Sequence, residues 1–315
     1  MSKLDDIIRK DIQELLENGE ISAAVALGPV MKTRSGVSEG FSTKGLPQYF
    51  TGDRKGKTVV VNLNPGMDAK ESDKKWSENK ARSGSCSIDE FIEYLMDRHT
   101  NFGLYDIDKN NPGKLRYDEF DVKQAAFLTP WKNSGIDLPE NPDWSDRDAC
   151  IDAKTKAICN KCQLELVPYA SSKFAINPKE IHLFRPHVDV LLDEIFSQPR
   201  EYVIFASAIF EKIFKDYNKE YPGTFDLSRP VVYGDVLKEG GSLRGKCKVI
   251  TMTYEGKNQK AIIAHTFPSQ ALCRAFALMQ KYGQFCYLEY IKLYKERDHE
   301  NYTQKPQRIC NFRLS

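Results

Sequence analysis

Hydrophobic positions along the chain fall into short apolar runs separated by segments with helical spacing. The runs lie between turn residues and occupy residues 58–61, 125–128, 164–167, 202–206 and 261–264. A short, mostly apolar run is typical of a strand that is buried on both faces, as in a parallel sheet covered by helices. The alternation of such strands with helices predicts an α/β fold: a three-layer α/β/α arrangement around a mainly parallel central sheet of about four to five strands.

Several of the intervening segments carry residues typical of helix starts. Apolar residues recur at helical spacing over residues 4–16, which predicts an amphipathic helix packed against the body of the protein. Ser87 and Ser145 each begin a Ser-x-x-acid pattern that favours a capped helix start, and Pro186 suits the first turn of another helix. Ser269 is expected to cap a helix over residues 271–279.

The 315 residues are expected to form one main domain with additions at both ends. Residues 1–45 are assigned to an N-terminal helix and lead-in segment, residues 46–290 to the α/β domain, and residues 291–315 to a polar tail. Within the domain, residues 221–259 form an insertion rich in glycine and proline. Its last part predicts a hairpin, with a turn at residues 255–258 that leads into the final core strand.

Composition narrows the classes of protein that the chain can belong to. Hydrophobic residues make up 41% and charged residues 29%, which predicts a packed core rather than disorder. The 46 basic and 44 acidic residues leave a formal charge of +2, so an anionic partner would have to be recognised locally. The eight scattered cysteines and the charged N-terminal segment predict reduced thiols in a cytoplasmic protein. No apolar run approaches the roughly 18 residues needed to cross a bilayer, so no membrane association is expected.

The first predicted strand ends in the segment Asn62, Leu63, Asn64, Pro65, Gly66 and Met67. In open α/β sheets, ligands bind beyond the carboxyl ends of the strands, so these residues are candidates for a binding site. Pro65 and Gly66 force a tight turn and place the Asn64 carboxamide at the strand tip, where it can orient a water molecule or a base edge. An ordinary turn between a strand and a loop is the alternative.

Two further predicted strands end beside an aromatic residue. Trp131 follows the run at 125–128, and Tyr169 follows the run at 164–167 and precedes Ser171, Ser172 and Lys173. An aromatic face can stack on a planar base, and nearby hydroxyl or ammonium groups can bind its edge or a phosphate. The alternative for Trp131 and Tyr169 is that both close the core.

The fourth strand end contains His265, Phe267, Pro268, Ser269 and Gln270. This turn leads into a predicted helix whose first N–H groups could hold a phosphate. A capped helix beside a structural histidine is the alternative.

Taken in order, these strand ends resemble the uracil-DNA glycosylase superfamily, in particular the branch with Asn-Pro-Gly in its first motif and Pro-Ser in its last. The resemblance covers residues 45–285. It implies that Asn64 orients the attacking water, that residues 65–67 line the base pocket, and that Arg274 follows the last motif at the duplex-probing loop. A base-binding Asn is not evident at residues 165–168, so the target base stays open.

The last motif departs from the family pattern at Phe267. The family carries His or Asn before Pro-Ser, whereas Phe267 precedes Pro268 and Ser269 here. Either His265 reaches the same space from the strand face that it is expected to share with Phe267, or the electrophilic group is absent.

The resemblance implies a hydrolase that cleaves the N-glycosidic bond of a damaged or deaminated base in DNA, as in base excision repair. Asn64 and His265 are the candidate catalytic residues, DNA is the expected partner, and neither a cofactor nor an obligate protein partner is required. Two alternatives stay open. One is a catalytically inactive protein that binds nucleic acid or nucleotides on the same fold, and the other is a hydrolase of a small nucleoside-like metabolite.

Other motifs carry less weight. Cys159 and Cys162 have the spacing of half a metal site, and some members of the superfamily bind an iron–sulfur cluster through four cysteines. A second Cys-x-x-Cys pair is missing from the sequence, which favours buried free thiols. The sequence also contains no Walker A, dinucleotide-binding, His-Glu-x-x-His or Gly-x-Ser-x-Gly motif, which argues against the corresponding enzyme classes.

Overall fold

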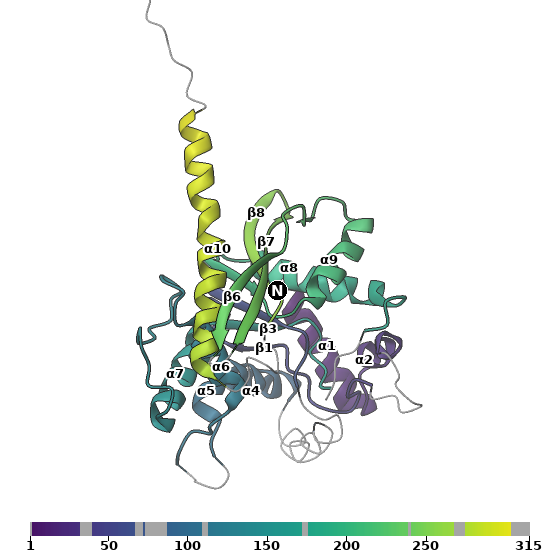
Figure 1. Cartoon of the computed structure of the whole chain (residues 1–315). Coiled ribbons are helices and arrows are strands. Elements are labelled where there is room, and N and C mark those ends of the chain that lie inside the picture. Colours follow the sequence, from purple (N-terminus) through teal and green to yellow (C-terminus); the bar gives the residue numbers. More distant parts are fainter. Residues whose placement is uncertain are drawn as a thin grey trace, which may run out of the picture.

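The computed structural model describes residues 2–31, 40–66, 72, 87–108, 113–171, 176–238, 241–267 and 275–303, with residues 235–238, 241–244 and 293–303 described by their backbone alone. A mixed β-sheet forms the centre of the molecule, and helices cover both of its faces (Figure 1). The predicted α/β class is therefore confirmed. No helix in the described part of the chain is both long and apolar enough to span a bilayer.

The described residues form a sheet of eight strands with the order β1-β3-β2-β4-β8-β7-β5, and β6 pairs with β7. The four central strands β3, β2, β4 and β8 run parallel, whereas β1 and the strands beyond β8 are antiparallel. The sheet is wider than the expected four to five strands because hairpins extend one edge. The strands are β1 Phe50–Gly52, β2 Thr58–Asn62, β3 Cys162–Glu165, β4 Tyr202–Phe205, β5 Phe225–Asp226, β6 Val232–Lys238, β7 Gly241–Tyr254 and β8 Lys257–Ala264.

Alternate residues of the central strands face two separate cores. Val59 and Val61 of β2 join the core under α1, α4, α8 and α9, whereas Val60 joins the core under α6, α7 and α10. This alternation explains why the central strands are apolar at successive positions. The helices are α1 Lys3–Asn18, α2 Ser22–Ala26, α4 Ile88–Thr100, α5 Phe102–Tyr105, α6 Glu119–Leu128, α7 Arg147–Asn160, α8 Arg185–Phe196, α9 Ile209–Glu220 and α10 Phe276–Thr303, with short 3₁₀ turns at Gly28–Val30 and Ile181–Phe184.

Most predicted helix starts are confirmed. Ser87 caps α4 through a capping box with Glu90, and Pro186 lies in the first turn of α8. The helix predicted after Ser145 begins one residue later than expected. Its cap is Asp146, whose carboxylate accepts the N–H of Ala149, because the Ser145 hydroxyl donates to Asp143 instead. The cap predicted at Ser269 lies outside the described residues.

The strand predicted at residues 125–128 is wrong, because these residues form the end of α6. The Asp118 carboxylate caps this helix by accepting the N–H groups of Phe120 and Asp121. Every residue of 122–128 is buried, since α6 packs against the sheet and both α7 and α10. A helix that is buried on all sides has the same continuous apolar pattern as a buried strand, so the pattern alone does not separate them.

The C-terminal third contains the predicted hairpin. β7 and β8 are joined at Glu255 and Gly256, which have φ angles of 48° and 75°, as a two-residue hairpin turn requires. The predicted tail at 291–315 begins inside a helix, because α10 continues to Thr303 and its end extends beyond the body of the protein (Figure 1).

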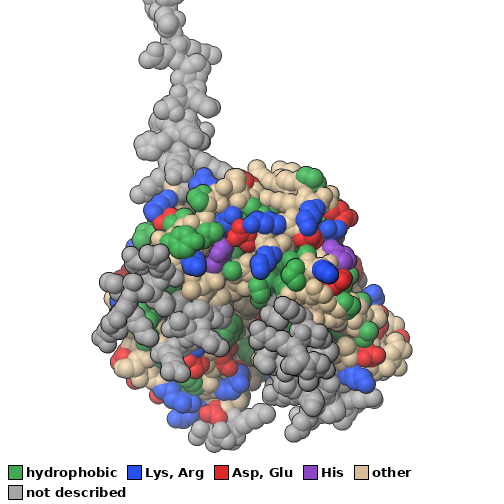
Figure 2. Space-filling model, turned by 45° about the vertical axis from the view of Figure 1, so that its right-hand side comes forward, with side chains coloured by type: hydrophobic (Ala, Val, Ile, Leu, Met, Phe, Trp, Pro, Cys, Tyr) green, Lys and Arg blue, Asp and Glu red, His purple; other side chains and the backbone are tan. Residues whose placement is uncertain are grey.

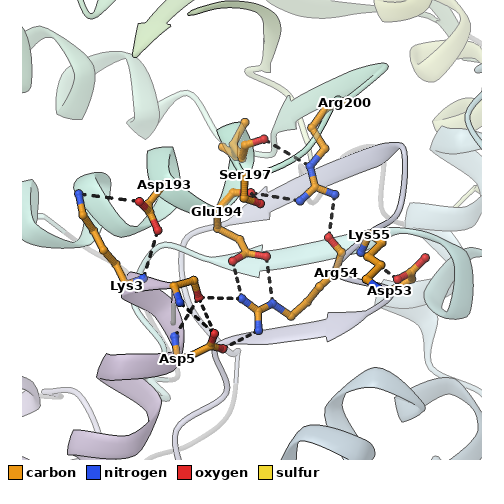
Figure 3. A network of polar contacts seen from close by, with 11 residues as sticks. Lys3, Asp5, Asp53, Arg54, Lys55, Asp193, Glu194, Ser197 and Arg200 are labelled. Carbon is orange, nitrogen blue, oxygen red and sulfur yellow. Dashed lines mark hydrogen bonds and ion pairs between the residues drawn. The ribbon is translucent and has the colours of Figure 1, made fainter. Parts of the chain in front are cut away.

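An arginine between β1 and β2 fixes the N-terminal helix to the body. The Arg54 guanidinium donates to Asp5 in α1 at 2.7 Å and makes two bonds to the Glu194 carboxylate in α8 at 3.0 and 2.5 Å (Figure 3). Burial disfavours the Arg54 charge, but the bonds and charges of Glu194 and Asp5 outweigh it and raise its pKa. Arg200 stabilises the segment between β1 and β2 by donating to the carbonyls of Arg54 and Gly56.

Candidate active site

A cavity of about 350 Å³ lies at the carboxyl ends of β2 and β3. This volume falls in the range of small-molecule sites. We name it the acid–amide cavity after the polar side chains in its wall. It is lined by Asn62, Asn64, Pro65 and Gly66 at the end of β2 and just after it, Gln163 and Glu165 from β3, Arg116 and Asp118 before α6, Phe120 and Asp121 in the first turn of α6, and Gln48, Thr51 and Phe102.

Three buried polar side chains meet in the wall of the acid–amide cavity. Asn62 and Glu165 are register partners of the parallel strands, and the Asn62 amide donates to Glu165 Oε1 at 3.2 Å. The Gln163 amide donates to the same oxygen at 2.9 Å. Within the described structure, Glu165 Oε2 and Gln163 Oε1 are buried without a hydrogen-bond partner. An unpaired buried polar atom is costly, so these two oxygens are acceptors with unused hydrogen-bonding capacity in the described structure.

The ionisable groups of the cavity have shifted pKa values. Burial raises the pKa of Glu165 to about 7, against the opposing effect of the bonds from Gln163 and Asn62. Burial also raises the pKa of Asp121 to about 6, while the nearby Lys161 charge opposes the shift. Lys161 itself is buried, and its pKa falls to about 8. Near neutral pH, Glu165 is therefore partly protonated and Asp121 mostly ionised, which is the division of roles that acid–base catalysis needs.

Asn64 occupies the wall of the same cavity, and its amide nitrogen is held by the neighbouring loop. The nitrogen donates to Ser171 Oγ at 2.9 Å and to the carbonyls of Pro65 and Tyr169 at 3.0 and 3.3 Å. These bonds tie the turn after β2 to the segment after β3. They leave the Asn64 carbonyl oxygen as the group that can accept a hydrogen bond from a water molecule or a substrate.

The two aromatic candidates do not line this cavity. Tyr169 is buried, and its hydroxyl donates to Asp11 at 2.7 Å, as does the hydroxyl of Tyr49. Trp131 is also buried, and its ring packs within 5.8 Å of the Phe127, Tyr202, Tyr287 and Tyr290 centroids. The structure therefore supports the core alternative for Trp131 and Tyr169, because neither ring has a face open to a base.

His265 faces α9 rather than the acid–amide cavity. Its Nε2 lies 3.4 Å from Glu211 Oε2, and Lys248 Nζ lies 3.1 Å from the other oxygen of that carboxylate. Burial lowers the pKa of His265. Phe267 packs on the opposite side of the sheet, with its ring centroid 4.9 Å from that of Phe127. The expected shared face is wrong, because β8 ends at Ala264 and a turn follows.

The remaining predicted site residues are not all described. Met67, Ser172, Lys173, Pro268, Ser269, Gln270 and Arg274 lie outside the described residues. Ser171 is described and accepts from Asn64.

Cys159 and Cys162 are both free thiols. Cys159 is a half-buried free thiol, and Cys162 is a buried one whose pKa burial raises to about 12. The described part of the chain contains no group of three or more residues suited to hold a metal ion.

Glu165, Gln163 and Asp121 are absent from the predicted site. Gln163 and Glu165 are two residues apart in a strand, so they lie on one face of it. Two polar residues on one face of an otherwise apolar central strand were the sequence feature that could have identified them.

We compared the chain with protein-family models and with curated proteins. No family model and no curated protein matches it.

Proposed function

We propose that this chain is a uracil-DNA-glycosylase-like hydrolase that cleaves the N-glycosidic bond of a deaminated or damaged base in DNA. The observation that carries the proposal is the acid–amide cavity, where a buried carboxyl group with a raised pKa lies beside two amides, a second carboxyl group and Asn64. This set suits both the recognition of a base edge and the departure of the base.

The cavity wall complements the polar edge of a planar base. Gln163 Oε1 can accept a hydrogen bond, and protonated Glu165 can donate one through Oε2. The rings of Phe102 and Phe120 also belong to the wall, where they can contact the base. A flipped base would then be held by its edge and by its ring.

The two carboxyl groups divide the chemistry of bond cleavage. Glu165 donates its proton to the departing base, and the Asp121 carboxylate stabilises positive charge on the sugar or takes a proton from water. The Asn64 carbonyl oxygen orients that water, while its amide nitrogen stays bound to Ser171. His265 has no step in this scheme.

The test is incubation with oligonucleotides that carry uracil, hypoxanthine or xanthine, followed by detection of alkali-labile abasic sites. We expect cleavage of at least one strand by the wild type and a loss of about a hundredfold or more in Asn64→Ala. Asn141→Ala, a change at an exposed asparagine, is the matched control and should cleave normally. Absence of cleavage on all three strands would contradict the proposal.

A second candidate is a hydrolase of free nucleosides. Asp118 lines the acid–amide cavity and Asp106 lines a neighbouring cavity, and basic and acidic side chains are interspersed over the described part of the face drawn in Figure 2. With a net charge of only +2, the chain has no general attraction for a polyanion. Preferential turnover of free deoxynucleosides over oligonucleotides would favour this candidate.

A further inference from the structure

A second cavity of about 360 Å³ adjoins the acid–amide cavity, and we name it the aromatic cavity. The two cavities share Gln48, Pro65 and Phe102 in their walls. Beyond these shared residues, the aromatic cavity is lined by Tyr94, Arg98 and His99 of α4 and by Tyr105 of α5. One elongated molecule could therefore occupy both cavities at once.

Arg98 supplies the positive charge of the aromatic cavity. Its guanidinium carbon lies 4.9 Å from the ring centroid of Tyr105 and 5.7 Å from that of Tyr94. None of the ion pairs among the described residues involves Arg98. Asp106, which also lines this cavity, is paired with Arg116 and Lys154. Burial lowers the pKa of His99 to about 4, so this residue adds no charge near neutral pH.

Exposed apolar side chains gather beside the two cavities. Among the described residues, eight large apolar side chains are exposed, and Leu104, Tyr105, Ile107 and Phe120 are four of them. Tyr105 and Ile107 line the aromatic cavity, Phe120 lines the acid–amide cavity, and Leu104 neighbours Tyr105 in α5. Such clustering marks a surface that contacts another molecule.

We infer that the aromatic cavity receives the nucleotide adjacent to the target base, with its base against the tyrosine rings and its phosphate paired with Arg98. Aromatic stacking accepts any base, and a guanidinium group can pair a phosphate through two parallel bonds. The inference rests on the proposed function and deepens it, because a subsite for a neighbouring nucleotide makes the substrate an oligonucleotide rather than a free nucleoside.

The test is fluorescence polarisation with labelled single strands of about six nucleotides that carry uracil, hypoxanthine or xanthine at an internal position. We expect Arg98→Gln to weaken binding about tenfold on every strand that the wild type binds. Arg147→Gln is the matched control, because Arg147 also lies over a tyrosine ring, that of Tyr117 at 5.1 Å, but lines neither cavity. Its binding should equal that of the wild type.

Equal binding by Arg98→Gln and the wild type would overturn the subsite, as would binding of free deoxynucleosides in preference to every strand. The absence of any binding by the wild type would also overturn it. A cleavage assay on the same strands separates the two proposals. Binding that depends on Arg98 without cleavage contradicts the proposed function alone, whereas cleavage that is insensitive to Arg98→Gln contradicts the subsite alone.

Discussion

The chemistry of the acid–amide cavity depends on one carboxyl group that is kept partly protonated near neutral pH. Glu165 accepts bonds from two amides at Oε1, while Oε2 stays unpaired within the described structure. Burial therefore dominates its titration and raises its pKa to about 7. Buried carboxyl groups of this kind are common at catalytic sites because the same desolvation that weakens the charged form creates an acid.

The pH dependence of activity follows from the two carboxyl groups. Asp121 must be ionised and Glu165 protonated, so kcat/KM should rise with pH through about 6 and fall through about 7. We expect Glu165→Gln to lower kcat/KM about a hundredfold or more and to abolish the falling limb, since glutamine has no proton to lose. Base release measured from about pH 5 to 9 checks this, and a falling limb that persists in Glu165→Gln would assign it to another group.

The same carboxyl group should lower stability at high pH. Its folded pKa lies above the ordinary glutamate value of 4.5, so the folded state binds the proton more tightly. The raised pKa contributes up to about 3 kcal/mol to the free energy of unfolding. This contribution is complete below about pH 4.5 and is lost as the pH rises through about 7. The free energy of unfolding of Glu165→Gln, measured by urea unfolding and compared with that of the wild type, should therefore rise by about 2 kcal/mol as the pH is raised from about 5 to 8. A difference that does not change with pH would show that Glu165 titrates normally.

His265 and Asn64 should differ sharply in their importance. His265 lies against Glu211 of α9, whereas Asn64 lines the acid–amide cavity. We expect His265→Ala to retain kcat/KM within about threefold, while Asn64→Ala loses about a hundredfold or more. Single-turnover cleavage assays on both variants measure this. A comparable loss in His265→Ala would return the histidine to the catalytic scheme.

At the scale of single residues, the sequence predicts the turn chemistry but not the buried partners. Pro65 and Gly66 follow a β-branched strand, and this local pattern is sufficient to place Asn64 at a strand tip. The partnership of Asn62 with Glu165 depends on the pairing of β2 with β3, which lie far apart in the sequence. Local patterns carry no information on such pairing, so the sequence alone does not bring Asn62 and Glu165 together.

At the scale of elements, the sequence predicts strands correctly where turn residues bound an apolar run that is buried on both faces. β2, β4 and the end of β8 follow this rule, and all three are central parallel strands. The failure at residues 125–128 comes from α6, which is enclosed by the sheet, α7 and α10. Enclosure removes the polar face by which an amphipathic helix is normally distinguished from a strand.

The attachment of α1 provides a stability test for an element. Glu194 is almost fully buried, and Arg54 makes two bonds to its carboxylate as well as one to Asp5 (Figure 3). Arg54→Ala leaves a buried carboxylate without its partner, so we expect a loss of about 3 kcal/mol in the free energy of unfolding. The adjacent Lys55→Ala, at an exposed side chain, should cost less than about 0.5 kcal/mol. Equal effects in the two variants would contradict this account.

At the scale of the whole molecule, the parallel sheet brings distant segments of the chain to one edge. Asn62 ends β2 and Asn64 follows it, Glu165 ends β3, and Asp121 lies in the first turn of α6, which packs over the same face. The topology of the sheet places these groups in one cavity, next to the aromatic cavity of α4 and α5. The cavity therefore arises from the order of the strands as much as from any single motif.

The most direct test of this account is to incubate DNA strands with the protein at about pH 6.5, between the pKa values of Asp121 and Glu165, and to measure the released free base by chromatography. The wild type and Glu140→Gln, a change at an exposed carboxylate, should release uracil, hypoxanthine or xanthine at equal rates. Glu165→Gln should release the same base about a hundredfold more slowly. Equal release by Glu165→Gln and the wild type, or no release from any strand by the wild type, would contradict the assignment of the acid–amide cavity as the active site.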